Sequence, residues 1–207
     1  MRIFARGTQF LDCGSGLPTA ENVHQVAQRV NPESKVGYVD NDPVITARGR
    51  TLLEENELNR YVEGDIFNPR SILDNETVRT HLDWHQPIAL SQVATLHHHK
   101  GERSAPAEVM REYIDALPRG SYVIISHLLD PESEDTAVMR ELEEAVARGS
   151  LGGATWRTRT EIEELFDGLE MVEPGITELV RWWPDGPQLK PLTVAHRIIA
   201  GEIGRKL

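Results

Sequence analysis

Short apolar runs alternate along the chain with longer segments whose apolar positions recur every three or four residues. Runs of the first kind, bounded by Gly, Pro, Asn or Asp, predict strands, and segments of the second kind predict helices. Regular alternation of the two is typical of a parallel sheet with crossover helices. The predicted strands are 9–13, 35–40, 60–64, 87–96, 121–126, 169–172 and 192–199.

The helix boundaries have their own signals. The first helix is predicted over 23–30, with Thr19 as its cap and Pro32 ending it. Asp42 and Pro43 form a capping residue and a first-turn proline, and open a second helix that runs to about residue 55. The start of the fourth strand is continuously apolar, which indicates burial on both faces at the centre of the sheet.

Three acidic residues follow the predicted strands in a regular way. Asp12, Asp40 and Asp65 each fall at or near the carboxyl end of a successive strand, the edge where open α/β sheets bind ligands. The first strand also runs into a turn that contains Gly14 and Gly16, which let a backbone approach a ligand without a Cβ in the way. We expect the three carboxylates to converge on one crevice.

A glycine turn with an acid some distance later is also the signature of dinucleotide binding. Here the third glycine position is Thr19, and Asp12 would lie beside the pyrophosphate. Two like charges about 4 Å apart repel by roughly 4 kcal/mol at an effective dielectric near 20. S-adenosylmethionine carries no phosphate, so Asp12 suits its cationic methionine end, Asp40 its ribose hydroxyls and Asp65 its adenine edge. The alternative is that each aspartate only caps a turn or helix, as we expect for Asp42.

Composition limits the classes of function. The chain has 207 residues, which fits a single domain over 1–207, and acidic residues outnumber basic ones 33 to 22. With no basic stripe, nucleic acid is not an expected partner. No apolar run is long enough to span a bilayer and no secretory signal begins the chain, so we expect no membrane partner and a cytoplasmic location. Cys13 is the only cysteine, which excludes an internal disulfide and predicts a small core residue.

Several blocks of the chain resemble a known family. FLDCGSGLPTAENVHQVAQ, VGYVDNDPVI, YVEGDIFNP, LPRGSYVIISH and LFDGLEMVEPG are similar to the S-adenosyl methyltransferase family that was long catalogued as a domain of unknown function. The resemblance covers nearly the whole chain. It implies a class I, Rossmann-like methyltransferase fold with seven strands in the order 3-2-1-4-5-7-6, the last antiparallel, and S-adenosylmethionine as cofactor. The cofactor-binding residues that it implies are Asp12, Gly14, Gly16, Asp40, Asn41, Asp65 and Ile66. We expect Pro18 in the same loop and Ser91 in the fourth strand to contribute as well.

The chain departs from this family pattern in two places. Family members carry a helical segment before the first strand, whereas here that strand begins close to Met1. Because the segment helps to cover the cofactor, we expect a second copy or a partner chain to complete the lid, unless the natural protein is longer. The second departure is the run 96–100, LHHHK, where the family has one histidine followed by an aromatic residue.

The histidines after the fourth strand raise the question of a metal. Three consecutive side chains cannot converge on one tetrahedral ion, so we expect no metal site there. His97 or His98 lies instead at the lip where the acceptor meets the methyl group, and His127, at the end of the fifth strand, is expected to open on the same edge. An imidazole there can act as general base. The alternative is a polar loop with one histidine packed under the rim.

The expected reaction is transfer of a methyl group to oxygen, nitrogen or carbon of a small molecule by in-line displacement. Trp182 and Trp183 predict either an apolar wall for an aromatic or hydrophobic acceptor, or one core residue and one subunit contact. Two other classes stay open at this point. One is a non-catalytic or partner-dependent S-adenosylmethionine-binding protein, and the other is a nicotinamide-dependent reductase on the same sheet.

Overall fold

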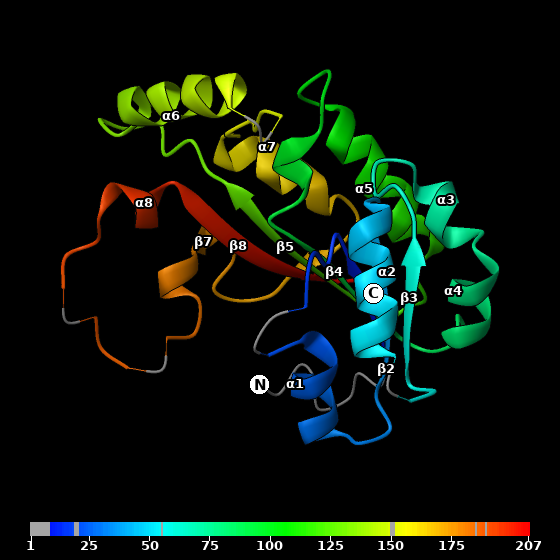
Figure 1. The fold of residues 1–207 in the computed structure, drawn as a ribbon. Coiled ribbons are helices and arrows are strands. Elements are labelled where there is room, and N and C mark those ends of the chain that lie inside the picture. The colour runs from blue at the N-terminus through cyan, green and yellow to red at the C-terminus, as the bar shows by residue number, and fades with distance from the viewer. Residues whose placement is uncertain (1–8, 19–20, 55, 150–151, 185, 189) are drawn as a thin grey trace.

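The computed structural model of the protein describes residues 9–18, 21–54, 56–149, 152–184, 186–188 and 190–207. Its centre is one sheet in the order β3-β2-β1-β4-β5-β8-β6, with β7 also paired to β8 (Figure 1). The first five of these strands are parallel, and β8 runs antiparallel to β5, β6 and β7. The strands are β1 (Gln9–Cys13), β2 (Lys35–Asp40), β3 (Asn59–Glu63), β4 (Ala89–Val93), β5 (Tyr122–Leu128), β6 (Glu170–Met171), β7 (Thr177–Glu178) and β8 (Ile199–Arg205).

The expected Rossmann-like order is confirmed, with one small addition. The two-residue strand β7 shifts the numbering, so the antiparallel strand inserted beside β5 is the eighth in the chain. The α-helices are α1 (Val23–Val30), α2 (Pro43–Leu53), α3 (Pro69–Leu73), α4 (Glu76–His81), α5 (Ala105–Ala116), α6 (Thr136–Arg148), α7 (Arg159–Glu163) and α8 (Val194–Arg197). Short 3-10 turns are η1 (Leu96–His98), η2 (Glu164–Phe166) and η3 (Leu179–Arg181).

Alternating side chains of β1 to β5 pack into two separate hydrophobic clusters. Phe10 on β1 packs in a cluster with Tyr38 and residues of α1 and α2. Its neighbour Leu11 packs in the larger cluster with side chains of α3, α4, α5 and α7. Because successive side chains of a strand point to opposite faces, the sheet is covered by α1 and α2 on one face and by α3–α5 and α7 on the other. Cys13 is buried in the larger cluster, as expected of a core residue.

The last strand is not where the sequence pattern suggested. Residues 192–199 were expected to be a strand, but Thr193 begins the short helix α8, whose first turn is closed by a bond from Thr193 N to His196 Nδ1 (3.1 Å). The strand starts at Ile199 and runs through two glycines. A Cβ on Gly201 would lie 2.5 Å from Leu179 Cδ2, and one on Gly204 would lie 2.8 Å from Leu169 Cδ1. These glycines make room for side chains that pack directly on the strand, which is why the segment does not resemble a strand in sequence.

The fourth strand is shorter than the expected range 87–96. It ends at Val93, because Ala94 takes a positive φ of 56° and the chain turns into η1. The first helix begins after Asn22, whose backbone N–H donates to Gln25 Oε1 (2.8 Å), and the expected cap Thr19 lies outside the described residues. No helix in the described part of the chain is both long and apolar enough to cross a membrane.

Candidate cofactor and acceptor site

Three aspartates lie at the carboxyl ends of adjacent strands. Asp12 is in β1, Asp40 is the last residue of β2, and Asp65 follows β3. Since β1, β2 and β3 are neighbours and parallel, these ends lie at one edge of the sheet. We call Asp12, Asp40 and Asp65 the carboxylate edge.

Asp40 connects the second strand to the glycine turn. Its Oδ2 accepts a hydrogen bond from Gly16 N (2.9 Å), and its Oδ1 accepts one from Asp42 N (3.0 Å). Each carboxylate oxygen can accept a further bond, so the side chain still has acceptor capacity for a ligand hydroxyl. Asp42 caps α2, as expected, by accepting from Val44 N (2.7 Å).

The two glycines of the turn have different surroundings. Both have a positive φ, 76° at Gly14 and 65° at Gly16. A Cβ on Gly14 would lie 2.4 Å from Thr95 Cγ2 and 3.8 Å from Ile66 Cδ1, so the loops after β1, β3 and β4 meet there. A Cβ on Gly16 would meet nothing within 4 Å. Gly14 therefore permits close packing of the loops, whereas the space beside the Gly16 Cα is free of protein atoms.

The carboxyl group of Asp12 is half-buried and has a short contact with β4. Ser91 Oγ on β4 donates to its Oδ1 (2.5 Å), and burial raises the pKa of Asp12. Among the ion pairs of the described residues, none includes Asp12, Asp40 or Asp65. A cationic ligand would supply the missing counter-charge, because an opposite charge nearby favours the ionised carboxylate.

Asp65 and its neighbour are held by local bonds. Asp65 Oδ1 accepts from Phe67 N (2.9 Å), and the carbonyl of Ile66 accepts from Tyr113 Oη (3.0 Å). The Asp65 side chain keeps a free carboxylate oxygen, and the Ile66 side chain is buried beneath the turn. Asn41 lies exposed beside the edge, while Pro18 is half-buried in the loop after Gly16.

A pocket of about 150 Å³ opens at this edge, lined by Asp12, Ser15, Gly16 and Pro18 among others. It is smaller than typical ligand pockets of roughly 300–1,000 Å³, so it encloses only part of a cofactor. The donor set fits S-adenosylmethionine: carboxylates outside the ion pairs suit its positive charges and hydroxyls, and the space beside the Gly16 Cα is free of protein atoms. We conclude that the residues present fit the cofactor.

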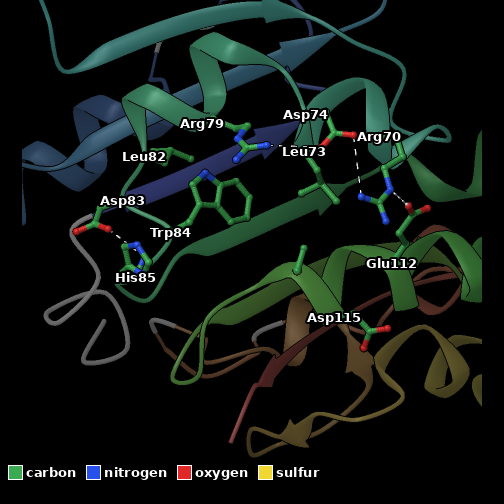
Figure 2. Close-up of a pocket in the computed structure, with 11 residues that line it drawn as sticks. Arg70, Leu73, Asp74, Arg79, Leu82, Asp83, Trp84, His85, Glu112 and Asp115 are labelled. Atoms are coloured by element: carbon green, nitrogen blue, oxygen red, sulfur yellow. Dashed lines mark hydrogen bonds and ion pairs between the residues drawn. The ribbon is translucent and has the colours of Figure 1, made fainter.

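A larger hollow of about 690 Å³ lies elsewhere, between α3–α4 and α5. Figure 2 shows Trp84 in its wall beside Arg79, with Arg70 paired to Asp74 and Glu112. It opens near the amino ends of the strands, because Asp83 O accepts from Gln9 Nε2 at the start of β1 (3.0 Å). This hollow is therefore separate from the carboxylate edge.

Next to the carboxylate edge, three histidines gather where β4 and β5 end. His97 and His98 are in η1, and their ring centroids are 4.3 Å apart, while His97 and His127 are 5.5 Å apart. His97 is buried and His98 is exposed. We call His97, His98 and His127 the histidine lip. Within the described residues, no group of three or more His, Cys, Asp or Glu is placed to hold a metal ion.

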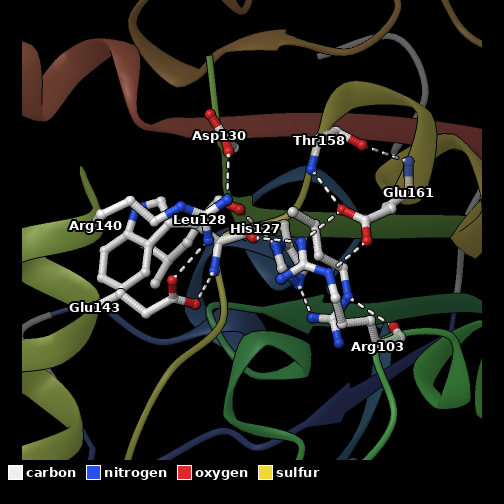
Figure 3. A network of polar contacts seen from close by, with 10 residues as sticks. Arg103, His127, Leu128, Asp130, Arg140, Glu143, Thr158 and Glu161 are labelled. Carbon is white, nitrogen blue, oxygen red and sulfur yellow. Dashed lines mark hydrogen bonds and ion pairs between the residues drawn. The ribbon is translucent and has the colours of Figure 1, made fainter. Parts of the chain in front are cut away.

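The expectation that His127 opens on this edge is wrong, because the side chain is only 1% exposed. Arg157 Nη1 lies 3.0 Å from His127 Nε2. His127 Nδ1 lies 2.8 Å from the carbonyl of Leu128, and Figure 3 labels these two residues. An arginine can only donate and a carbonyl can only accept, so His127 is neutral with its proton on Nδ1. Both ring nitrogens are engaged, and burial lowers the pKa of His127 to about 3.

His98 is oriented differently. Its Nδ1 lies 3.0 Å from the carbonyl of Gly153, which can only accept, so Nδ1 carries a proton and, in the neutral ring, Nε2 has the lone pair. His97 lies behind it, and burial, together with His98 and Arg157, lowers the pKa of His97 to about 4. The histidine lip therefore contains one exposed ring that is oriented by a carbonyl, and two buried neutral rings.

Sequence reasoning did not identify Gly153 and Arg157. Both lie in an irregular segment after α6, far along the chain from the histidines, and neither belongs to a recognisable motif. Trp182 also has an unexpected role, because its Nε1 donates to the carbonyls of Gly175 (3.2 Å) and Gly201 (2.8 Å). Trp183 beside it is 45% exposed.

Comparison with known proteins agrees with this geometry. The profile of the S-adenosyl methyltransferase family matches residues 2–207. A candidate methyltransferase from Thermobifida fusca YX is 34% identical, with a TM-score of 0.88 over 99% of this chain and 79% of that one. A protein of the family DUF574 from Streptomyces avermitilis MA-4680 is 38% identical, with a TM-score of 0.86 over 98% of this chain and 77% of that one.

A more distant structure, human N-acetylserotonin methyltransferase in complex with S-adenosylmethionine, shares the fold at 14% identity. Its TM-score is 0.58 over 98% of this chain and 48% of that one. The comparison with curated protein sequences finds no match. The family uses S-adenosylmethionine to methylate its substrates. Since the family profile matches residues 2–207 of this chain, the chain belongs to the S-adenosyl methyltransferase family.

Proposed function

We propose that this methyltransferase acts on a small molecule that it binds between the carboxylate edge and the histidine lip, and that His98 is its general base. The single observation that carries the proposal is the pair of adjacent sites: carboxylates without cationic partners after β1–β3, and an oriented, exposed imidazole after β4. When bound, S-adenosylmethionine supplies a methyl group on a positively charged sulfur. The chain's own residues hold the reactants in line and accept a proton.

On this proposal each part of the carboxylate edge has a separate task. Asp12, which has no cationic partner among the described residues, neutralises the positive methionine end. Asp40 accepts from the ribose hydroxyls, with Asn41 beside it, and Asp65 and Ile66 border the adenine. Gly14, Gly16 and Pro18 shape the loop, while Ser91 fixes the Asp12 carboxylate through the bond to its Oδ1 (2.5 Å).

His98 has the features of a base that an acceptor can reach. Its ring is exposed, and the Gly153 carbonyl holds the proton on Nδ1, which leaves the Nε2 lone pair available. His98 Nε2 takes the acceptor's proton as the acceptor atom, O, N or C, becomes nucleophilic. His97 and His127 stand behind it as buried neutral rings, so we assign to them support of His98 rather than proton transfer.

We further infer an aromatic or hydrophobic acceptor. Gly201 pairs with Ser126 and Ser126 with Val93, so these residues share the sheet face of Ser91 and Asp12. Leu179 packs on Gly201, and the exposed Trp183 belongs to the same loop. An indole there offers a rigid apolar wall on the side of the sheet where Asp12 lies.

We also propose that a lid completes the site, supplied by a second copy or by a partner chain. Leu17, which lines the small pocket, is 47% exposed, and Val93 at the end of β4 is 49% exposed, so apolar side chains are available for such a lid to cover. Light scattering with and without S-adenosylhomocysteine tests for a dimer. A cytoplasmic location is part of the same proposal and is supported by the lone, buried Cys13.

Calorimetric titration with S-adenosylhomocysteine tests the cofactor assignment. In Asp40→Ala, loss of charge-assisted bonds to the ribose and of the clamp on Gly16 should weaken binding by about 100-fold. Asp42→Asn is the matched control, because asparagine still caps α2, and its affinity should equal that of wild type. An Asp40→Ala protein that binds as tightly as wild type contradicts the assignment.

A further inference from the structure

Arg157 is a buried arginine that lacks the usual counter-ion. The side chain is 1% exposed. Its Nε donates to the carbonyl of Arg103 (3.1 Å) and its Nη1 to His127 Nε2 (3.0 Å). None of the ion pairs among the described residues includes Arg157. Since burying an unpaired charge is costly, such an arginine calls for a functional or structural reason.

Arg157 ends a segment that connects the two strand ends at the histidine lip. We call residues 153–157 the strap. Its backbone is fixed to β5, because Arg157 N donates to the Leu128 carbonyl (3.1 Å) and the Arg157 carbonyl accepts from Asp130 N (2.8 Å). At its other end the strap is fixed to η1, since Thr155 N donates to the His97 carbonyl (2.8 Å).

The strap also supplies the carbonyl that orients the proposed base. Gly153 O accepts from His98 Nδ1 (3.0 Å). At the opposite end of the same strap, Arg157 fixes His127 as the Nδ1–H tautomer. The rings of His127, His97 and His98 follow one another at 5.5 and 4.3 Å. Arg157 does not bind His98 directly but is connected to it in two ways. One connection is the backbone of the strap, and the other is the row of histidine rings.

The neighbouring Arg103 differs from Arg157, because it has a carboxylate partner. Arg103 donates to both carboxylate oxygens of Glu161 (2.6 and 2.7 Å) and to the carbonyl of Trp156 (2.8 Å), as Figure 3 shows for the labelled pair. The Arg103 guanidinium lowers the pKa of Glu161 to about 2. Both carboxylate oxygens of Glu161 therefore accept hydrogen bonds from Arg103. Arg157 instead donates to a histidine, His127.

We propose that Arg157 is a positioning residue of the methyl-transfer site: it locks the tautomer of His127 and anchors the strap, and so aims His98 Nε2 at the acceptor. The assignment of His98 as base rests on the proposed function above. The tautomer lock and the anchoring of the strap are properties of this chain that exist without cofactor or acceptor. They can therefore be tested separately from activity.

The groups around the rings agree with neutral histidines. His97 faces His98 on its own turn, His127 on β5 and Arg157 on the strap; burial contributes most to the lowering of its pKa, and His98 and Arg157 add to it. His127 faces Arg157 and His97, with Glu161 acting in the opposite direction. A cation beside a histidine disfavours its protonation, so Arg157 helps to keep both rings neutral.

Two-dimensional ¹H–¹⁵N spectra of the imidazoles test the proposal directly on the cofactor-free protein. In wild type we expect His127 and His98 both as Nδ1–H tautomers at pH 7, with His127 unchanged down to pH 5. In Arg157→Met we expect His127 to lose its fixed tautomer, His98 to become a mixture of tautomers, and the pKa of His97 to rise. Arg148→Met, an exposed arginine on α6, is the matched control and should leave the spectra unchanged.

Two results overturn the proposal. One is a wild-type spectrum with His98 or His127 as the Nε2–H tautomer, which needs no variant and so stands even if Arg157→Met fails to fold. The other is a folded Arg157→Met protein whose histidine signals match wild type. In that variant S-adenosylhomocysteine affinity should stay within about twofold of wild type, because the carboxylate edge does not contact Arg157. A loss of affinity in Asp40→Ala alone therefore reports on the proposed function, and a change in tautomers reports on Arg157.

Discussion

The carboxylate edge and the histidine lip are neighbours on one sheet but are built in opposite ways. Most contacts of the carboxylate edge are made close to the strand ends: Asp40 binds Gly16 and Asp42, and Asp65 binds Phe67, whereas Asp12 binds Ser91 on β4. The histidine lip depends on distant residues, because His98 is oriented by Gly153 and His127 by Arg157. The positions of the three carboxylates can thus be encoded by short motifs at the strand ends, whereas the orientation of the proposed base depends on a segment that the fold brings in from elsewhere in the chain.

The largest expected effect separates the two regions by function. His98→Asn should lower kcat by about 10²- to 10⁴-fold, the usual contribution of a general base, and leave S-adenosylhomocysteine affinity unchanged. The measurement is the rate of S-adenosylhomocysteine release with an acceptor found by screening. His85→Asn, which changes an exposed histidine remote from the site, is the control. An unchanged rate in His98→Asn would mean that the enzyme works by alignment alone.

The next prediction concerns the contact between the glycine turn after β1 and the loop after β4, where Gly14 lies against Thr95. Gly14→Ala should destabilise the fold by about 2–4 kcal/mol, because its Cβ would meet Thr95 Cγ2 and its φ is positive. Gly16→Ala has the same kind of φ and open space, so it should cost only about 1 kcal/mol. Urea unfolding measures both values.

A second substitution shows whether the contact with Thr95 is the cause. Thr95→Ser removes Cγ2 and keeps the hydroxyl that donates to Gln92 Oε1 (3.0 Å). In the Gly14→Ala background it should restore part of the lost stability, as a double-mutant cycle would measure. Strict additivity of the two changes would show that the loops do not meet at Gly14.

For a single residue, a smaller effect than that of Gly14→Ala is expected on stability in acid. The folded pKa values of about 4 for His97 and about 3 for His127 lie below the value of about 6.5 expected in an unfolded chain. The unfolded chain then binds more protons, so this stability is present above pH 6.5 and is lost as the pH falls toward 4. Between pH 7 and pH 5 the loss should be roughly 1–2 kcal/mol for each histidine.

Urea unfolding at these two pH values measures the loss. His97→Asn should be less sensitive to acid than wild type, whereas His85→Asn should behave like wild type. Equal acid sensitivity of wild type and His97→Asn would mean that His97 titrates normally in the folded protein.

The fold was largely predictable because its determinants are local. Apolar runs, the Asp42 cap and Pro43 identify β1, β2 and α2 to within a residue or two. The last strand was misplaced because it contains Gly201 and Gly204, which make room for Leu179 and Leu169. The local sequence pattern does not indicate this packing.

In the site, too, the residues placed by local sequence could be predicted, and those placed by long-range contacts could not. The positions of Asp12, Asp40 and Asp65 follow from strand ends and could be predicted, as could the presence of histidines at the neighbouring edge. The burial of His127 and the roles of Gly153 and Arg157 could not, because they depend on contacts between residues far apart in the chain: 30 positions separate His127 and Arg157, and 55 separate His98 and Gly153.

The most direct test of the account is a crystal structure with S-adenosylhomocysteine bound. We expect its amino group and sulfur beside Asp12, its ribose hydroxyls on Asp40, and its sulfur side open toward His98. Density for the molecule in the hollow beside Trp84, or a bound molecule with Asp12 and Asp40 turned away from it, would contradict the claim that the carboxylate edge and the histidine lip form one methyl-transfer site.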